Sequence, residues 1–197
     1  MMLPPRLILA SASPRRAQLL QQLGVQFGIA PADIDETPAV AEPAGQYVCR
    51  MAEEKALACQ RRLDCAVRQQ THVLGADTSV VCDGMILGKP DDALAAVGFL
   101  RRLSGRSHQV LTAVCLVTAG SRQTLLQTST VTFMPLTDLQ ISRYVASGEP
   151  MGKAGGYAIQ GRAAAFITDL QGSYSSVMGL PLAETAGLLR TAQCLGY

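Results

Sequence analysis

Short apolar runs alternate with helical patterns along the first part of the chain. Residues 7–10 form an apolar run bounded by turn-forming residues, which is typical of a buried strand. The apolar residues that follow recur at helical spacing, at Leu19, Leu20 and Leu23. Ser13 is a good N-cap for this helix, Pro14 is favoured at its first position, and Gly24 suits its end. The chain therefore opens with a strand that leads directly into a helix.

The same two patterns predict the elements of the remaining chain. Helices are expected at residues 44–63, 91–103, 137–147 and 181–195. Strands are expected at residues 25–29, 72–76 and 164–170, with hairpins at residues 80–87 and 107–134. Strands and helices alternate early and a hairpin lies in the middle, which predicts an α/β fold with a mixed sheet and flanking helices.

Arg15 and Arg16 occupy the first turn of the first helix, where free N–H groups and the helix dipole already create a positive end. A sequence optimised for stability alone would place acids there, and a broken local rule is expected at functional sites. Together with Ser11 and Ser13, the two guanidinium groups predict an anion site, most naturally for phosphate. Alternatively, both arginines extend into solvent or pair with acids elsewhere.

A second group of charged residues combines carboxylates with lysines. Asp77 follows a predicted buried strand, at the end where open α/β sheets place their ligands, and Asp35 and Glu36 lie in a loop. Lys55 falls on the apolar stripe of a helix, so it needs a partner or a function unless it extends to the rim of the core. Carboxylates with cations such as Lys55 and Lys89 are typical of a Mg²⁺ or Mn²⁺ site for a phosphorylated substrate. Each acid taken alone is more commonly a solvated loop residue or a helix cap.

Composition narrows the classes of function. The 197 residues suit one domain, residues 1–197, or one domain with a small lobe, and can bury a sizeable core. A net charge of +2 gives no argument for nucleic-acid binding, and no apolar run predicts a membrane span or a signal peptide. The 6 cysteines form no C-x-x-C pair and there are only 2 histidines, so a zinc site is not expected. Reduced thiols in a cytoplasmic protein are the expectation.

Two stretches resemble catalytic motifs only superficially. Residues 84–90 are similar to a P-loop, but the glycines are one residue too close, and Pro90 stands where a Ser or Thr would hold the metal. Residues 173–176 are rich in serine but lack the G-x-S-x-G pattern of a nucleophilic serine. A helix start is expected there instead.

Several of these stretches, taken in order, resemble the Maf family of nucleoside triphosphate pyrophosphatases. The resemblance runs from Leu7 to about Leu189. Its motifs are Ser11-Ala12-Ser13-Pro14-Arg15-Arg16, Asp35-Glu36, Glu54-Lys55-Ala56, Gly75-Ala76-Asp77-Thr78, Gly88-Lys89-Pro90, the KAGGYAIQG run at residues 153–161, and Gly179-Leu180-Pro181-Leu182.

The resemblance implies hydrolysis of a nucleoside triphosphate between its α and β phosphates, with a divalent cation, Mg²⁺ or Mn²⁺, as cofactor. Asp77 is implied as the proton acceptor that activates water, and Glu36 as a metal-holding residue beside Asp77. The residues implied to bind the triphosphate are Ser11, Arg15, Lys55 and Lys89.

The resemblance also implies which nucleotide is used. Arg15, Thr78 and Gln160 match positions that mark the branch acting on dTTP and UTP, with modified pyrimidine nucleotides as a further substrate class. A glutamine amide donates and accepts, which suits the O4 and N3–H edge of uracil or thymine. The 7-methyl-GTP branch is the second choice, and a nucleotide-binding regulator of septum formation is the alternative without catalysis.

The fold implied by the resemblance is a twisted mixed sheet with two lobes around a cleft, similar to inosine triphosphate pyrophosphatases. A homodimer is the implied assembly, and the nucleoside triphosphate is the only implied partner besides the metal.

Overall fold

The computed structural model describes residues 6–195, and these fall into two compact units. The first unit comprises residues 6–77, Thr112–Gln127 and residues 179–195, and the second comprises Thr78–Leu111 and Thr128–Met178. Within the described residues, seven strands form one sheet in the order β2-β1-β3-β5-β6-β7, with β4 paired to β3. Parallel and antiparallel pairs both occur, so the predicted mixed α/β sheet is confirmed.

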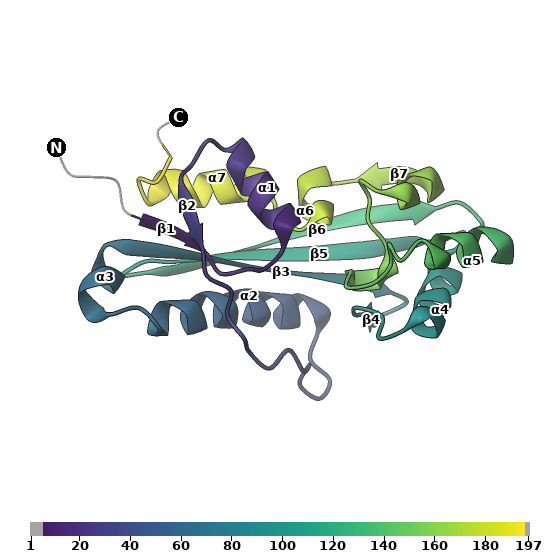
Figure 1. Cartoon of the computed structure of the whole chain (residues 1–197), viewed down its shortest axis with the longest axis horizontal. Coiled ribbons are helices and arrows are strands. Elements are labelled where there is room, and N and C mark those ends of the chain that lie inside the picture. Colours follow the sequence, from purple (N-terminus) through teal and green to yellow (C-terminus); the bar gives the residue numbers. More distant parts are fainter. Residues whose placement is uncertain (1–5, 196–197) are drawn as a thin grey trace. The chain divides into compact units, whose positions relative to one another are not determined.

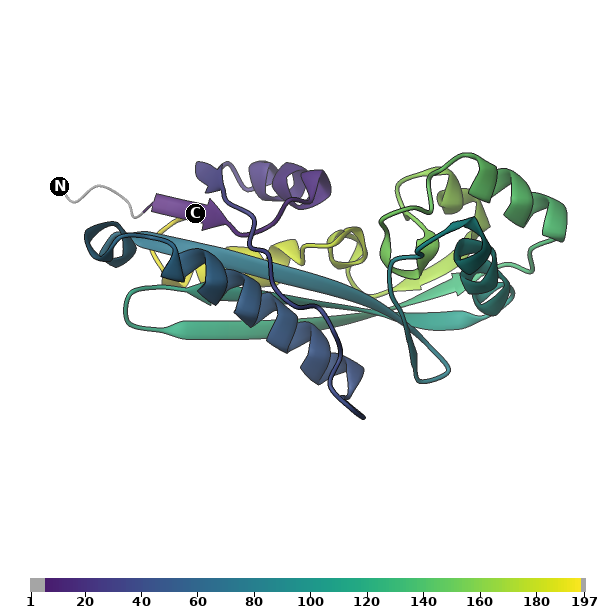
Figure 2. The same ribbon diagram turned by 60° about the horizontal axis from the view of Figure 1, so that its bottom comes forward.

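In the first unit, β1 (Arg6–Leu9) lies between β2 (Phe27–Ile29) and β3 (Thr71–Cys82) and runs parallel to both. The helix α2 lies on one face of these strands, and α1 and α7 lie on the other, as Figures 1 and 2 show. The helices of this unit are α1 (Pro14–Gln22), α2 (Ala44–Arg61), α3 (Cys65–Gln69) and α7 (Leu182–Thr191).

The first helix begins and ends as its sequence predicts. Ser13 is the N-cap, and its side chain accepts a hydrogen bond from the Arg16 amide, while Pro14 is the first helical residue. After the helix, Gly24 adopts a φ of 66°, a left-handed conformation that glycine reaches without strain. The strand and helix around the two arginines are therefore set largely by local sequence.

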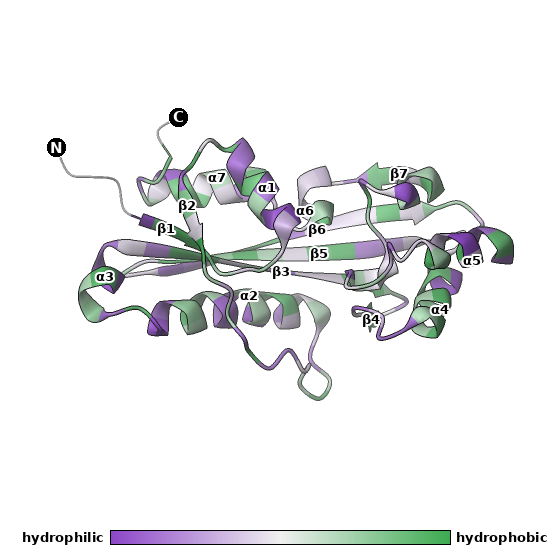
Figure 3. Cartoon of the chain, viewed as in Figure 1, coloured by the Kyte–Doolittle hydropathy of each residue, from purple (hydrophilic) through white to green (hydrophobic). Residues whose placement is uncertain are grey.

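The second helix packs closely against β3. Its buried stripe includes Val48, Met51, Ala52 and Ala56, each fully inaccessible, while hydrophilic residues occupy its other side (Figure 3). Gly75 on β3 allows this approach, because a Cβ atom there would lie 2.2 Å from the Ala52 carbonyl oxygen. Small residues on both elements thus bring the helix backbone down onto the strand.

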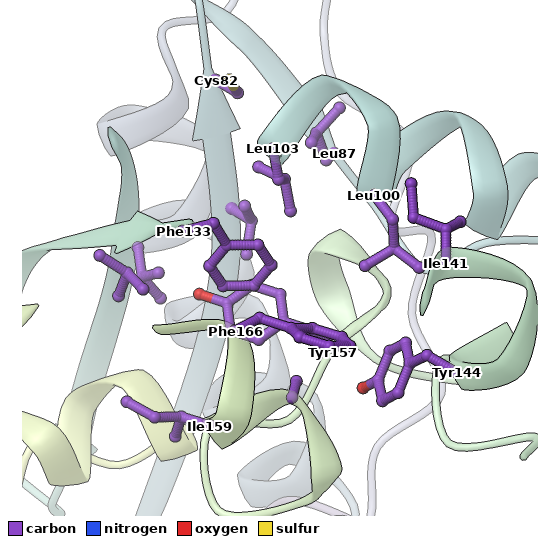
Figure 4. Packing of buried hydrophobic residues seen from close by; sticks show 14 residues of the cluster. Cys82, Leu87, Leu100, Leu103, Phe133, Ile141, Tyr144, Tyr157, Ile159 and Phe166 are labelled. Atoms are coloured by element: carbon purple, nitrogen blue, oxygen red, sulfur yellow. The ribbon is translucent and has the colours of Figure 1, made fainter. Parts of the chain in front are cut away.

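The second unit has its own hydrophobic core. Phe133, Tyr157 and Phe166 pack edge to face, with centroids 4.9 Å apart for Phe133 and Tyr157 and 6.2 Å apart for Phe133 and Phe166 (Figure 4). This unit includes parts of three long strands, β3, β5 (Ser107–Val117) and β6 (Arg122–Phe133). Its other elements are β4 (Met85–Leu87), α4 (Ala93–Leu103), α5 (Asp138–Ala146), η1 (Ala154–Gly156), η2 (Arg162–Phe166), β7 (Ile167–Gln171) and α6 (Tyr174–Met178).

One predicted boundary that bears on function is wrong. The strand expected at residues 72–76 does not end before Asp77 but runs from Thr71 to Cys82, so Asp77 lies within β3. The polar run at Asp77 resembles a strand end, yet its neighbours continue the buried pattern, and residues Val80–Cys82 pair with β4. The turn of that hairpin is as predicted, since Asp83 and Gly84 have φ values of 51° and 74°, as a type I′ turn requires.

Smaller differences lie at short helical turns. The strand expected from residue 164 begins at Ile167, because η2 occupies Arg162–Phe166. The short helices α3 and η1 carry no apolar periodicity long enough to predict. Among the described residues, no helix is both long and apolar enough to cross a membrane.

His108 is a buried titratable group in the core of the second unit, and we expect it to make the folded protein less stable in acid. Its Nε2 lies 2.8 Å from the Tyr157 hydroxyl oxygen, and burial lowers the pKa of His108 from 6.5 to about 4. Between these values the unfolded chain binds a proton that the folded chain does not. The free energy of unfolding should therefore fall by about 3 kcal/mol as the pH drops from neutrality to about 4.

Urea unfolding at pH 7 and pH 5 tests this expectation against His108→Gln, which keeps a hydrogen-bonding group but does not titrate. The variant should lose less stability than the wild type between the two pH values. Equal losses in both proteins would contradict the assignment to His108.

Candidate functional site

Lys55 lies between two carboxylates in the first unit. Its Nζ is 2.6 Å from Asp77 Oδ1 and 2.6 Å from Glu36 Oε1. Lys55 and Asp77 are each only 8% exposed, whereas the Glu36 side chain keeps 42% of its surface accessible. The lysine on the apolar stripe of α2 is thus a buried group with partners, and the alternative of a side chain at the rim is wrong. Three predicted site residues from a loop, a helix and a strand meet at one ammonium group.

The ammonium group of Lys55 stabilises the two carboxylates electrostatically. Two carboxylates that approach the same point repel each other, and burial removes the water that would screen them. Lys55 offsets this repulsion at both carboxylates. The close packing of α2 on Gly75 brings the helix near β3, the strand that also carries Asp77.

The turn between β1 and α1 contains a second cationic group. Arg16 donates from Nε to the Gly179 carbonyl oxygen at 2.9 Å and from Nη1 to Ser11 Oγ at 3.2 Å. Ser11 Oγ also accepts from the Ser13 amide at 3.2 Å. Arg16 therefore does not extend into solvent; it ties the opening turn to the segment before α7.

The charges of this turn and of the carboxylate pair influence each other. Burial lowers the pKa of Arg16, and the positive charge of Arg15 lowers it further, whereas the charges of Asp77 and Glu36 raise it. This mutual influence indicates that the arginines and the carboxylates share one region of the first unit. Arg15 itself is half-buried in the first turn of α1.

Asp35 has a local structural contact. Its Oδ1 accepts a hydrogen bond from the Thr37 amide at 2.9 Å, and the hydrogen bonds from Thr37 lower the pKa of Asp35. This Asx-type turn sets the backbone of the loop around Glu36, which lies between Asp35 and Thr37. Of the two neighbouring acids, Glu36 is the one that reaches Lys55.

Three predicted substrate-binding residues, Thr78, Lys89 and Gln160, belong to the second unit, and their roles stay predictions. Thr78 is half-buried on β3, while Lys89 and Gln160 are exposed. Residues Met85–Leu87 form a strand of a hairpin, so the prediction that residues 84–90 are not a P-loop is confirmed.

A carboxylate that the sequence does not single out, Glu149, supports the segment after Gln160. Glu149 accepts from the amides of Arg162 at 3.0 Å and Ala163 at 3.4 Å, and from the Tyr144 hydroxyl at 2.9 Å. Gly161 packs so closely that a Cβ atom there would lie 2.3 Å from Glu149 Oε1. Nothing in the local pattern around Glu149 distinguishes it from a solvated loop acid.

The donor set in the first unit suits a hard divalent ion. Within residues 6–195, no group of three or more His, Cys, Asp or Glu side chains is placed to hold a metal. Mg²⁺ is commonly held by one or two carboxylates together with substrate phosphates, and Glu36 and Asp77 are two carboxylates that contact the same Lys55 ammonium group. The two residues therefore fit an ion that binds together with a phosphorylated substrate.

The model of the family described as Maf-like protein matches residues 6–192. This chain belongs to the Maf family. A relative from Aromatoleum aromaticum, named dTTP/UTP pyrophosphatase, is 50% identical over 94% of this chain and 95% of its own length. Relatives of the same name from Colwellia psychrerythraea and Ralstonia nicotianae are each 51% identical, over 97% and 95% of this chain and 90% and 94% of their own lengths.

A solved structure, that of the Staphylococcus aureus Ham1 protein, aligns with this Maf family member over 65% of this chain and 71% of that chain. The TM-score is 0.42 and the sequence identity is 12%. The expected likeness to inosine triphosphate pyrophosphatases, with two lobes around a cleft, stays a prediction.

Proposed function

We propose that this Maf protein hydrolyses dTTP and UTP to the nucleoside monophosphate and pyrophosphate. The observation that carries the proposal is the match, at about half identity and over nearly the whole chain, to relatives named dTTP/UTP pyrophosphatase. The arrangement of charges in the first unit supports it, since two carboxylates and several cations suit a polyphosphate substrate.

In this proposal Asp77 takes the proton of the water that attacks the α-phosphorus. The 2.6 Å contact with Lys55 supports this proposal, because it holds the buried carboxylate in one orientation. Water oxygen forms the new bond to the α-phosphorus, and the bond to the bridging oxygen breaks with release of pyrophosphate. Glu36 and Asp77 would hold a divalent ion, which would neutralise part of the charge on the triphosphate.

Cationic and polar side chains bind the substrate in this proposal. Arg15, Lys55 and Lys89 offset the negative charge of the triphosphate, and Ser11 and Thr78 offer hydroxyl groups to it. The exposed amide of Gln160 donates and accepts at the O4 and N3–H edge of the pyrimidine. Arg16 holds the turn that carries Ser11 and Arg15.

The proposal is tested by incubating the purified protein with each nucleoside triphosphate, and with 7-methyl-GTP, in Mg²⁺ or Mn²⁺, and measuring pyrophosphate release. We expect dTTP and UTP to be the best substrates and release to stop when the metal is chelated. Much faster turnover of 7-methyl-GTP would assign the chain to that branch instead. Binding of a nucleotide without any turnover would favour the regulator of septum formation.

A further inference from the structure

The segment that carries Glu36 contains neither helix nor strand. Residues 30–43 run from the end of β2 to the start of α2 as a loop. A loop of this kind does not by itself hold a carboxylate at one point, because its backbone has many accessible conformations. Contacts from outside the loop must therefore place Glu36 beside Lys55.

The first of these contacts comes from Tyr47 in the first turns of α2. Its hydroxyl group donates to the main-chain carbonyl oxygen of Glu36 at 2.8 Å. Tyr47 is only 9% exposed, so its hydroxyl reaches the loop from a packed position. Tyr47 thus holds the backbone of the same residue whose side chain Lys55 holds.

Arg50, one turn further along α2, holds the following part of the loop. Its Nη2 donates to the Thr37 carbonyl oxygen at 3.2 Å, and Nε and Nη2 donate to the two carboxylate oxygens of Glu42 at 2.7 Å each. Glu42 in turn accepts from the Ala39 amide at 2.9 Å. The Arg50 guanidinium carbon lies 5.7 Å from the centroid of the Tyr47 ring, so the two anchoring side chains also support each other.

We infer that Tyr47 is a positioning residue, which with Arg50 fixes the Glu36 backbone so that its carboxylate stays beside Lys55 and Asp77. The helix α2 then holds both parts of Glu36, its main chain through Tyr47 and its side chain through Lys55. The consequence for turnover rests on the proposed pyrophosphatase function, whereas the anchoring itself does not.

A direct role of Tyr47 in proton transfer is not supported by its surroundings. Its hydroxyl proton is directed to a carbonyl oxygen. Burial, together with the charges of Asp77 and Glu36, raises the pKa of Tyr47 to about 12. The side chain therefore remains a hydrogen-bond donor throughout the neutral range.

The test uses Tyr47→Phe, which keeps the ring and removes only the hydroxyl group. Hydrogen exchange of the amides at residues 31–42 should accelerate about three- to tenfold, the effect of losing one such bond. For dTTP we expect kcat to fall by a similar factor and KM to stay within about twofold, because the residues proposed to bind the triphosphate are unchanged. In a Glu36→Gln background, Tyr47→Phe should reduce kcat no further.

Thr124→Val is the matched control, since it also removes one hydroxyl that bonds to α2, through the 2.7 Å contact with Glu53. It should change neither the exchange of residues 31–42 nor kcat. Unchanged exchange in Tyr47→Phe, or a full further loss of kcat in the Glu36→Gln background, would overturn the inference. If the wild type releases no pyrophosphate from any nucleotide, the proposed function fails, and exchange alone decides whether Tyr47 anchors the loop.

Discussion

Replacing Asp77 with asparagine is expected to lower pyrophosphate release from dTTP by at least about 100-fold, as the loss of a general base commonly does. The substitution keeps the shape of the side chain and removes only its ability to accept a proton. Lys55 retains Glu36 as a charged partner and can still donate to the new amide oxygen, so the buried ammonium group is not abandoned. The fold should survive, which circular dichroism and urea unfolding check.

Asp83→Asn provides the control for this change. Asp83 lies in the β3–β4 turn, where it pairs with Arg106 at 2.7 Å, and asparagine tolerates its positive φ. The control variant should turn over dTTP at the wild-type rate. Near-normal activity of Asp77→Asn would remove Asp77 from its proposed role, even if dTTP remains the substrate.

Replacing Gly75 with alanine should destabilise the protein by at least about 2 kcal/mol, the cost of overpacking a closed interior. The new Cβ atom would lie 2.2 Å from the backbone oxygen of Ala52 and 2.9 Å from the Cβ atom of Ala56. Backbone cannot rotate aside as a side chain can, so α2 must shift away from β3. Because Lys55 lies on α2, turnover per folded molecule should fall as well.

Gly98→Ala is the matched control for the added methyl group. Gly98 lies in α4, and apart from its chain neighbours and the nearby backbone of its own helix, no described atom lies within 4 Å of the position that its Cβ would take. This variant should be stabilised by about 0.5–1 kcal/mol, since alanine favours the helix more than glycine does. Urea unfolding midpoints compare the two variants, and equal stability of Gly75→Ala and the wild type would contradict the close packing.

Local sequence was sufficient to predict those elements whose structure is decided by local forces. The N-cap Ser13, the following Pro14 and the stop at Gly24 predict α1, because each acts on neighbouring backbone groups. The place of Lys55 on an apolar stripe left burial with a partner and extension to the rim equally open, and the structure buries the side chain. Its partners could not be chosen from spacing alone, because Glu36 and Asp77 come from distant segments of the chain.

Prediction from local sequence failed for features of the structure that tertiary contacts decide. Asp77 looked like the residue after a strand because a polar run began there, yet the strand continues and pairs with β4. No local pattern singles out Tyr47 or Glu149 as a residue that anchors a loop. Their roles depend on the carbonyl and amide groups that they meet in the folded chain, which no local pattern encodes.

The bond from Arg16 to the Gly179 carbonyl oxygen joins residues 163 positions apart. During synthesis on the ribosome, the half-buried guanidinium group of Arg16 can therefore meet this acceptor only after almost the whole chain has been made. All residues of the second unit, which ends at Met178, have been made by then. The stretch that starts at Gly179 is accordingly the last component of the first unit, and a nascent chain that stops at residue 178 lacks the carbonyl that Arg16 requires.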